Sequence, residues 1–419
     1  MPESISSQPE TQYTCFDPNN PPPPLMTGEP DSFARYTITT RIPAILERVL
    51  IDHRDFYPPK MVARLRELQH ELTEDQRLRP LITDAPDAAQ WASAWAMQRH
   101  QTWHNVPWYF AEAFFYRRLI EAVDYFGAAP WAGRDPFLLP KQAELAGETA
   151  WRVLTAALQE STEQSTTSLR TLLHFCLWGN RVDLSYLQVA QASGRQIVIE
   201  NEAANLLVDD TEIVIAHLQA LRNRTPSARR VDFICDNTGT ELLTDLALAD
   251  FLLAGHWVEQ IVLHVKFHPT FVSDTIVADL DLTLAAMQAQ SERASPELAK
   301  RLTRYRASGK LVVRADWFWN SSYFFWQIPA ILQAELAQAQ LVIVKGDANY
   351  RRLLGDSRWP TVAAACAAIP YFPTSLVALR TLTSDPIVGL PPRQASILDQ
   401  ADPAWRINGK RGMIQAVLK

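Results

Sequence analysis

The order of hydrophobic and polar residues divides the chain into parts of different texture. From about residue 33 to residue 193, apolar residues recur at steps of three and four, the spacing of one face of an α-helix. The segments with this spacing are 40–53, 59–72, 105–126, 144–161 and 168–180. We therefore predict a helical subdomain over residues 33–193.

From residue 194 the pattern changes to short β-branched runs separated by stretches of helix length. Nearly continuous apolar runs of this kind are typical of parallel strands covered on both faces. The runs are 195–201, 230–237, 260–269, 310–317, 340–347, 376–380 and 385–390, and the helical patterns between them include 242–255, 278–290 and 323–339. This alternation predicts an α/β fold, a doubly wound three-layer α/β/α sheet domain over residues 194–419.

Composition narrows the class of protein. Residues 1–32 are polar and proline-rich, so we predict an extended segment without regular structure. The chain has 419 residues, 47% of them hydrophobic, enough for a large core. Its 40 basic and 46 acidic residues give a net charge of −6 without long blocks of one sign. This predicts no nucleic-acid or membrane partner and favours a small-molecule ligand.

Cysteine usage and targeting signals indicate the compartment. The four cysteines have neither CxxC nor zinc-site spacing, so we expect reduced thiols. No secretory signal opens the chain, and no apolar run is long enough to span a bilayer. A cytoplasmic protein is therefore expected, while the sequence does not predict its oligomeric state.

Polar side chains follow several of the predicted strands. In open parallel sheets, ligands bind beyond the carboxyl ends of the strands, so these side chains should converge. The oxygen-bearing candidates are Asp236, Asn237, Asp274, Asp347 and Asn349, and the candidate cations are Lys266, Lys345 and Arg351. Oxygen ligands suit a divalent ion such as Mg²⁺ or Mn²⁺, and cations suit an anionic substrate. Together they favour metal-assisted phosphoryl transfer.

An ordinary structural interpretation remains open beside this chemistry. Asp and Asn are favoured helix N-caps and turn residues, so Asp236 and Asn237 can serve only to begin the helix that follows. Phosphate-binding GxxxxGK[ST], dinucleotide-binding GxGxxG, hydrolase GxSxG and zinc-protease HExxH motifs are all absent. From the residues alone, a metal–phosphate site and a set of structural caps are about equally supported.

Several stretches together resemble the metal-dependent damage-control phosphatases, in their acidic-residue methyltransferase-like, sugar-phosphate branch. The stretches are DNTGTELLTDLALADFLL, HVKFHPTFVSD, VKGDANYRRLLGD and RTLTSD, with PPPPLMTGEPDSFARYTITTRIPAIL near the start and LWGNRVDLS in the middle. They occur from about residue 20 to the C-terminus. The resemblance therefore covers nearly the whole chain.

The resemblance implies roles for individual residues. Asp236, Asn237 and Asp274 match the family's catalytic metal ligands, which would hold Mn²⁺, Mg²⁺, Co²⁺ or Ni²⁺. Substrate-binding positions would be Asp236, Asn237, Glu241, Lys345, Asp347, Ala348, Asn349, Tyr350, Arg351 and Thr383. A phosphatase acting on small phosphorylated metabolites, such as fructose 1-phosphate or fructose 6-phosphate, is the function so implied.

One departure from the family pattern leaves alternatives open. The branch carries an Arg-Thr-x-Lys motif whose lysine contacts the substrate phosphate, and here Thr383 stands in place of that lysine. Loss of a charge-assisted contact typically removes a few kcal/mol. One alternative is a metal-dependent binding protein with altered or lost turnover. The other is S-adenosylmethionine-dependent carboxyl methylation, although the usual glycine-rich cofactor loop is absent.

Overall fold

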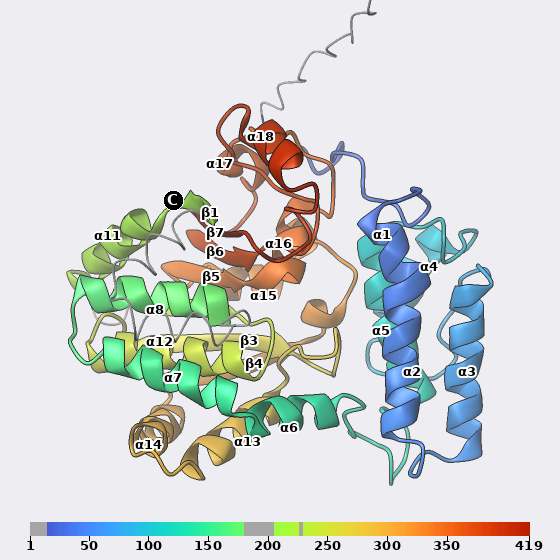
Figure 1. Cartoon of the computed structure of the whole chain (residues 1–419), viewed down its shortest axis with the longest axis horizontal. Coiled ribbons are helices and arrows are strands. Elements are labelled where there is room, and N and C mark those ends of the chain that lie inside the picture. The colour runs from blue at the N-terminus through green and yellow to red at the C-terminus, as the bar shows by residue number, and fades with distance from the viewer. Residues whose placement is uncertain (1–14, 180–204, 226–228) are drawn as a thin grey trace, which may run out of the picture.

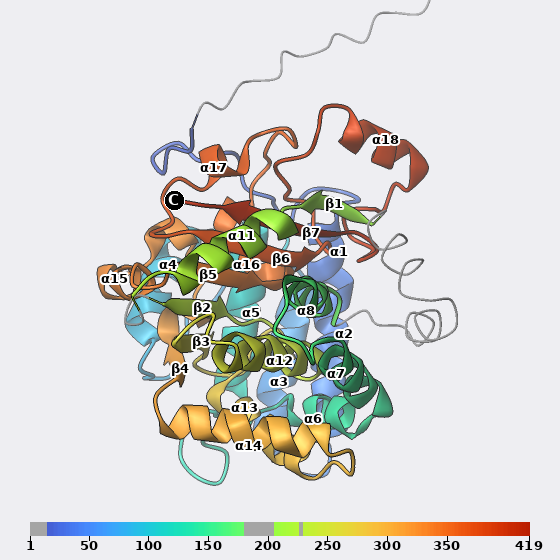
Figure 2. The ribbon, with the colours of Figure 1, turned by 90° about the vertical axis from the view of Figure 1, so that its left-hand side faces the viewer.

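A seven-stranded sheet forms the centre of the molecule. The computed structural model describes residues 15–179, 205–225 and 229–419. The strands are β1 (Leu206–Asp209), β2 (Arg230–Ile234), β3 (Gln260–Lys266), β4 (Leu311–Asp316), β5 (Leu341–Lys345), β6 (Leu376–Thr381) and β7 (Gly412–Val417). Their spatial order is β1-β7-β6-β5-β2-β3-β4 (Figure 2). The central strands β2 and β5 are buried along their whole length, and the charged Arg230 and Asp232 of β2 pair with each other.

The order in which the chain visits neighbouring strands reverses between β2 and β5. Strands β4, β3, β2, β5 and β6 are parallel, whereas β7 runs antiparallel to β6 and β1 parallel to β7. From β2 the chain proceeds to β3 on one side, and from β5 it proceeds to β6 on the other. The carboxyl ends of β2 and β5 therefore flank a topological switch point, where α/β proteins bind their ligands.

Helices cover both faces of the sheet, each with its own hydrophobic core. One face carries α6 (Leu138–Ala146), α7 (Glu148–Glu160), α8 (Thr166–Trp178), α11 (Thr211–Arg222), α12 (Thr240–Ala254), α13 (Val277–Gln288) and α14 (Ala294–Ala307). The other carries α15 (Ala330–Leu336), α16 (Gly346–Leu354), α17 (Ala365–Ala368) and α18 (Gln394–Ala401). Short 3₁₀ turns, η4 (Trp317–Asn320) and η5 (Phe325–Gln327), follow β4. The predicted three-layer α/β fold is thus confirmed.

The first helices form a separate layer beside the sheet (Figure 1). They are α1 (Phe33–Tyr36), the π-helical turn η1 (Thr37–Arg41), α2 (Ile42–Asp52), α3 (Pro59–Thr73), α4 (Ala88–Gln98) and α5 (Trp108–Ala122). Their apolar faces enclose a third core, against which Phe271, Val272 and Tyr323 also pack. These three residues follow β3 and β4, so the layer lies against the loops at the carboxyl edge of the sheet.

Some predicted elements differ from the structure. The segment 385–390 was predicted as a strand but forms none, because Pro386 lacks an N–H and the neighbouring groups bond elsewhere: Gly389 N–H donates to Ala363 and Leu390 N–H to Thr361. The helix predicted at 323–339 is interrupted before Pro329. Strands β1 and β7 were not predicted, and the strand predicted at 195–201 lies outside the described residues.

The proposed domain boundaries remain predictions. Helices α7 and α8 pack with α12 in the core on the sheet, while α2 to α5 surround the separate core. Across the described ranges, no helix combines the length and apolarity needed to cross a membrane.

Candidate active site

The turn after β2 presents Asp236 and Asn237 at the switch point. Gly239 has a φ of 69°, a conformation suited to glycine, and lets the chain turn directly into α12. The Asn237 side-chain amide donates to Oδ2 of Asp236 at 3.0 Å and to Oε2 of Glu241 at 3.0 Å. Its amide oxygen accepts from the Ser273 hydroxyl. These bonds hold the two neighbouring polar side chains together.

The loop after β3 brings Asp274 to the same turn. The backbone N–H of Thr275 donates to the carbonyl of Asp236 at 2.7 Å, and the N–H of Thr238 donates to the carbonyl of Ser273 at 2.8 Å. Asn237 and Asp274 form an antiparallel bridge. The three predicted metal ligands therefore come together, although 36 residues separate Asp274 from Asn237 in the sequence.

The junction of β5 and α16 forms the opposite wall. Helix α16 begins at Gly346, whose φ of 78° turns the chain directly from strand to helix. A Cβ atom at this position would lie 1.9 Å from Oδ2 of Asp236, so only glycine leaves room for that carboxylate. Asn349 donates to the carbonyl of Cys235 at 3.2 Å and links the helix to the end of β2. Oδ1 of Asp347 accepts from Nε of Arg380 at 2.6 Å.

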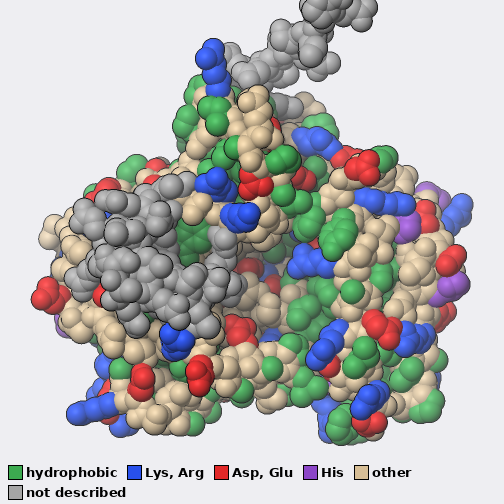
Figure 3. Space-filling model, in the orientation of Figure 1, with side chains coloured by type: hydrophobic (Ala, Val, Ile, Leu, Met, Phe, Trp, Pro, Cys, Tyr) green, Lys and Arg blue, Asp and Glu red, His purple; other side chains and the backbone are tan. Residues whose placement is uncertain are grey.

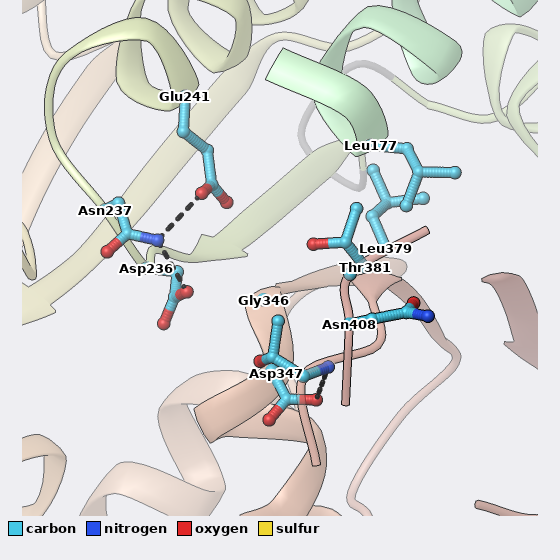
Figure 4. A pocket seen from close by; sticks show the side chains of 11 residues that line it. Leu177, Asp236, Asn237, Glu241, Gly346, Asp347, Leu379, Thr381 and Asn408 are labelled. Carbon is cyan, nitrogen blue, oxygen red and sulfur yellow. Dashed lines mark hydrogen bonds between the residues drawn. The ribbon is translucent and has the colours of Figure 1, made fainter. Parts of the chain in front are cut away.

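These walls enclose a pocket of about 300 Å³. Its lining residues are Leu177, Asp236, Asn237, Glu241, Gly346, Asp347, Leu379, Thr381, Thr383, Asn408 and Gly409. Figure 4 shows Asp236 and Asn237 on the β2 side, facing Asp347 and Thr381 on the side of β5 and β6. The molecule is also hollowed between the sheet-bearing part and the α1–α5 layer (Figure 3).

The pocket's charge fits a bound cation. Three of the described lining residues, Asp236, Glu241 and Asp347, carry carboxylates. The described lining contains no Lys or Arg. Burial raises the pKa of Asp236 well above its usual range, and the nearby charges of Asp274 and Glu241 raise it further. Burial also raises the pKa of Asp274 to about 6, although Lys266 opposes this shift. A cation between these groups would relieve their repulsion.

Unpartnered oxygens show where such a cation fits. Within the described part of the chain, Oδ1 of Asp236 is buried without a hydrogen-bond partner. Oδ2 of Asp274 also accepts no hydrogen bond there, although it forms an ion pair with Lys266 at 3.3 Å. Buried polar atoms are rarely left unsatisfied, and a divalent ion takes such oxygens as ligands. The side-chain amide of Asn237 is bonded to Asp236, and the role of its oxygen as a third ligand remains a prediction. Among the described residues, no cluster of three His, Cys, Asp or Glu side chains suited to a metal occurs.

The three candidate cations are all engaged by carboxylates. Lys266 pairs with Asp274, and Nζ of Lys345 donates to Oδ1 of Asp245 at 2.7 Å and lies 3.3 Å from Oε1 of Glu241. The guanidinium of Arg351 forms two bonds with Asp356, at 2.8 and 2.9 Å, and a third with Glu112. None of the three lines the described pocket, so the contact of these cations with an anionic substrate remains a prediction.

The remaining predicted site residues occupy different positions. Thr383 lies on the pocket wall, where its N–H donates to Oδ1 of Asp347 at 3.3 Å. Ala348 and Asn349 belong to the first turn of α16 but do not line the pocket. The hydroxyl of Tyr350 is turned toward β7, where it donates to Gln415 at 2.8 Å. The contact of these residues with substrate remains a prediction.

Sequence reasoning missed several lining residues. Gly346 could have been found from the sequence, because a glycine between a strand and a helix indicates close approach of another group. Thr381 and Leu379 lie at the end of β6. The strand was predicted, but which of its residues face the pocket was not. Asn408 and Gly409 precede β7, which was not predicted, so the sequence carried no signal for them.

Comparison with known proteins identifies the family of this chain. The model of the damage-control phosphatase ARMT1-like domain matches residues 37–398. The chain belongs to the ARMT1-like damage-control phosphatase family. The protein named damage-control phosphatase ARMT1 from Rattus norvegicus is 32% identical over 93% of this chain and 97% of its own. The Homo sapiens protein of that name is 30% identical over 94% of this chain and 98% of its own.

A solved structure from Pyrococcus horikoshii, described as a protein of the DUF89 family, is 14% identical to this chain. It covers 91% of this chain and 97% of its own, with a TM-score of 0.47.

Membership in the damage-control phosphatase family confirms the predicted enzyme class. The chain is a metal-dependent phosphatase of small metabolites. The ligand set of its ion, the identity of that ion and the substrate remain predictions.

Proposed function

We propose that this phosphatase hydrolyses hexose phosphates, such as fructose 1-phosphate or fructose 6-phosphate, with a divalent ion held by Asp236, Asn237 and Asp274. The observation that carries the proposal is the buried oxygen of Asp236 that has no partner within the described structure, beside the similarly placed oxygen of Asp274. A structural cap would instead have its side-chain oxygen bonded to a backbone N–H. The capping interpretation therefore loses support.

The charge of the pocket supports an anionic substrate only together with the ion. Three carboxylates would repel a phosphate dianion in this partly enclosed site. When bound, a divalent ion supplies positive charge that polarises the phosphoryl group and lowers the pKa of water. Asp236 and Asp274 would be held ionised as its ligands, since a nearby positive charge lowers the pKa of a carboxyl group.

The first turn of α16 supplies the phosphate-binding geometry in this proposal. The first backbone N–H groups of a helix lack partners within the helix, and the helix dipole favours an anion there. In α16 these groups belong to Gly346, Asp347 and Ala348, of which Gly346 and Asp347 line the pocket. Arg351 would then act by fastening α16, through its bonds to Asp356 and Glu112, rather than by gripping phosphate.

Phosphate release from chelator-treated protein tests the proposal. The protein is stripped of metal and supplied with Mn²⁺, Mg²⁺, Co²⁺ or Ni²⁺ in turn, with fructose 1-phosphate, fructose 6-phosphate and an aryl phosphate as substrates. We expect hydrolysis of the sugar phosphates with at least one ion, and loss of both hydrolysis and metal binding in Asp274→Ala. The exposed Asp281, which pairs with Arg306, provides the control Asp281→Ala.

Three outcomes would contradict parts of the proposal. Hydrolysis of the aryl phosphate alone would remove the sugar-phosphate assignment. Unchanged metal affinity in Asp274→Ala would remove that residue from the ligand set. Calorimetric binding of metal and sugar phosphate without turnover would instead identify a binding protein.

A further inference from the structure

Helix α6 contacts both loops that carry the proposed metal ligands. It joins the α1–α5 layer to the helices on the sheet and lies beside α7 and α13 (Figure 1). Two of its side chains, Lys141 and Glu144, are three residues apart and therefore lie on one face of the helix. Lys141 reaches the loop after β3, and Glu144 reaches the turn after β2.

Lys141 forms three hydrogen bonds, two of which fasten the loop of Asp274. Its buried Nζ donates to the backbone carbonyl of Asp274 at 3.2 Å, to Oδ2 of Asp279 at 2.7 Å and to Oδ2 of Asp135 at 2.9 Å. These bonds use all three donors of the ammonium group. Oδ2 of Asp279 also accepts from the N–H of Ile276, so the lysine holds both ends of the segment 274–279.

Glu144 fastens the other loop at the start of α12. Its Oε1 accepts from the backbone N–H of Thr240 at 2.8 Å and from the Thr240 hydroxyl at 2.7 Å. The carboxylate thus caps α12 from a different helix, where a negative charge is favourable. A Cβ at Gly239 would lie 2.3 Å from this carboxylate, which shows how closely Glu144 packs against the turn. Asn237 lies only three residues before Thr240.

We propose that α6 sets the distance between the two ligand-bearing loops, so that Lys141 and Glu144 act as positioning residues for the metal site. The inference rests on the proposed ligands Asp236, Asn237 and Asp274. Lys141 holds the backbone of one ligand, and Glu144 holds the helix that follows the other two. Neither side chain lines the described pocket, so neither contacts substrate there.

Positioning residues contribute to metal affinity because ligands that are already in place lose less freedom when the ion binds. Groups that orient metal ligands typically account for 10–100-fold in metal affinity. Loss of Lys141 would free the Asp274 carbonyl, and loss of Glu144 would leave two donors of Thr240 unbonded. Either change should allow the ligands to move apart without removing any of them.

Calorimetric titration of chelator-stripped protein with Mn²⁺ tests this directly, without relying on turnover. We expect Kd to rise about tenfold or more in Lys141→Met and Glu144→Ala. Glu144→Gln, whose side-chain oxygen can still accept from Thr240, should recover most of the affinity. The control Arg301→Met breaks the ion pair of Arg301 with Asp250, at the far end of α12, and should leave Kd within about twofold of wild type.

The variants separate the inference from the function on which it rests. If wild-type protein binds Mn²⁺, Asp274→Ala does not, and both α6 variants bind as tightly as wild type, α6 has no positioning role and the ligand set stands. If wild type and Asp274→Ala bind alike, the ligand set fails and the inference fails with it. Lys141→Met leaves Asp135 and Asp279 uncompensated; should it not fold, Glu144→Ala and its rescue by Glu144→Gln decide the question.

Discussion

At the scale of single residues, Gly346 and Asp236 depend on each other. The carboxylate of Asp236 occupies the space that a side chain at position 346 would need. The sequence presents both residues, in stretches that run from strand to helix, but their contact follows only from the adjacency of β2 and β5. The glycine that forms this turn therefore also leaves room for a proposed metal ligand.

Gly346→Ala tests this dependence. We expect Asp236 to be displaced and kcat/KM to fall by about 100-fold, the typical effect of a misplacement of about 1 Å in an active site. Gly309→Ala is the matched control, because Gly309 has a similar φ of 74° but no atom within 4 Å of an added Cβ. Steady-state kinetics and urea unfolding of both variants separate the effect of backbone strain from the effect of the clash. Equal losses of activity in the two variants would argue against the clash with Asp236 as the cause.

Thr383 is the second residue with a distinct expectation. It lies on the pocket wall beside Asp347, where the family pattern has a lysine. The candidate cations nearby are already paired, so Thr383→Lys would introduce an uncommitted positive charge. A charge-assisted bond to phosphate should then lower KM for sugar phosphates by about tenfold. Thr383→Met, of similar length without charge, is the control, and lost activity without tighter binding would mean that this wall serves another ligand.

At the scale of elements, Lys345 links β5 to α12. Its buried ammonium lies between Asp245 and Glu241 and donates to the carbonyl of Cys176 in α8. Burial disfavours its charged form, but the two carboxylates raise its pKa above the ordinary value. Because Glu241 also accepts a hydrogen bond from Asn237, Lys345 is linked to the proposed site through Glu241 of α12. Its ammonium is buried between α8 and α12, and Lys345 does not line the described pocket.

Lys345→Met should therefore destabilise the fold more than it weakens substrate binding. Removing one partner leaves buried carboxylates uncompensated, which typically costs 3–5 kcal/mol. Urea unfolding of Lys345→Met, Asp245→Asn and the double variant should show strong coupling, with the double variant more stable than the sum of the single losses predicts. A variant of unchanged stability with a raised KM would instead return Lys345 to direct contact with phosphate.

Elements with strong local patterns could be predicted from the sequence, and those defined by distant partners could not. The buried strands β2, β3 and β5 and the loops after them follow from their apolar runs, which brought Asp236, Asn237 and Asp347 to one edge. Strand β7 pairs antiparallel with β6, a partner that precedes it by about 30 residues, and its apolar pattern is interrupted by Gln415. The pocket wall before β7 was missed for the same reason. The ion pairs of Lys345 with Asp245 and of Arg351 with Glu112 were also beyond prediction, because these partners come from helices distant in the sequence.

At the scale of the whole molecule, His268 lies where the α1–α5 layer meets the loops of the sheet. It is buried after β3, with Phe126 packed edge-on at 5.7 Å and Asp87, at the start of α4, 3.9 Å from Nε2. Asp87 is already bound by Arg117 through two hydrogen bonds, at 2.7 and 2.9 Å. Burial, and then the charge of Arg117, lower the pKa of His268 to about 4, which Asp87 opposes only weakly.

His268 should therefore make the junction of the two layers sensitive to acid. The folded protein resists protonation of His268 until about pH 4, whereas the unfolded chain takes up the proton near its ordinary value of 6.5. Stability from this residue is thus fully present above pH 6.5 and is lost as the pH falls toward 4, by up to about 3 kcal/mol. Asp236 and Asp274 change stability in the opposite direction, because their pKa values are raised.

The test compares wild type with His268→Asn. The free energy of unfolding in urea is measured for each protein at pH 7 and at pH 4.5, and the change between the two pH values is compared. The Asn amide can still donate to the carbonyl of Pro269, as the imidazole does. The variant should be less sensitive to acid by about 2 kcal/mol or more. An identical pH dependence would show that the pKa of His268 is the same in the folded and the unfolded state.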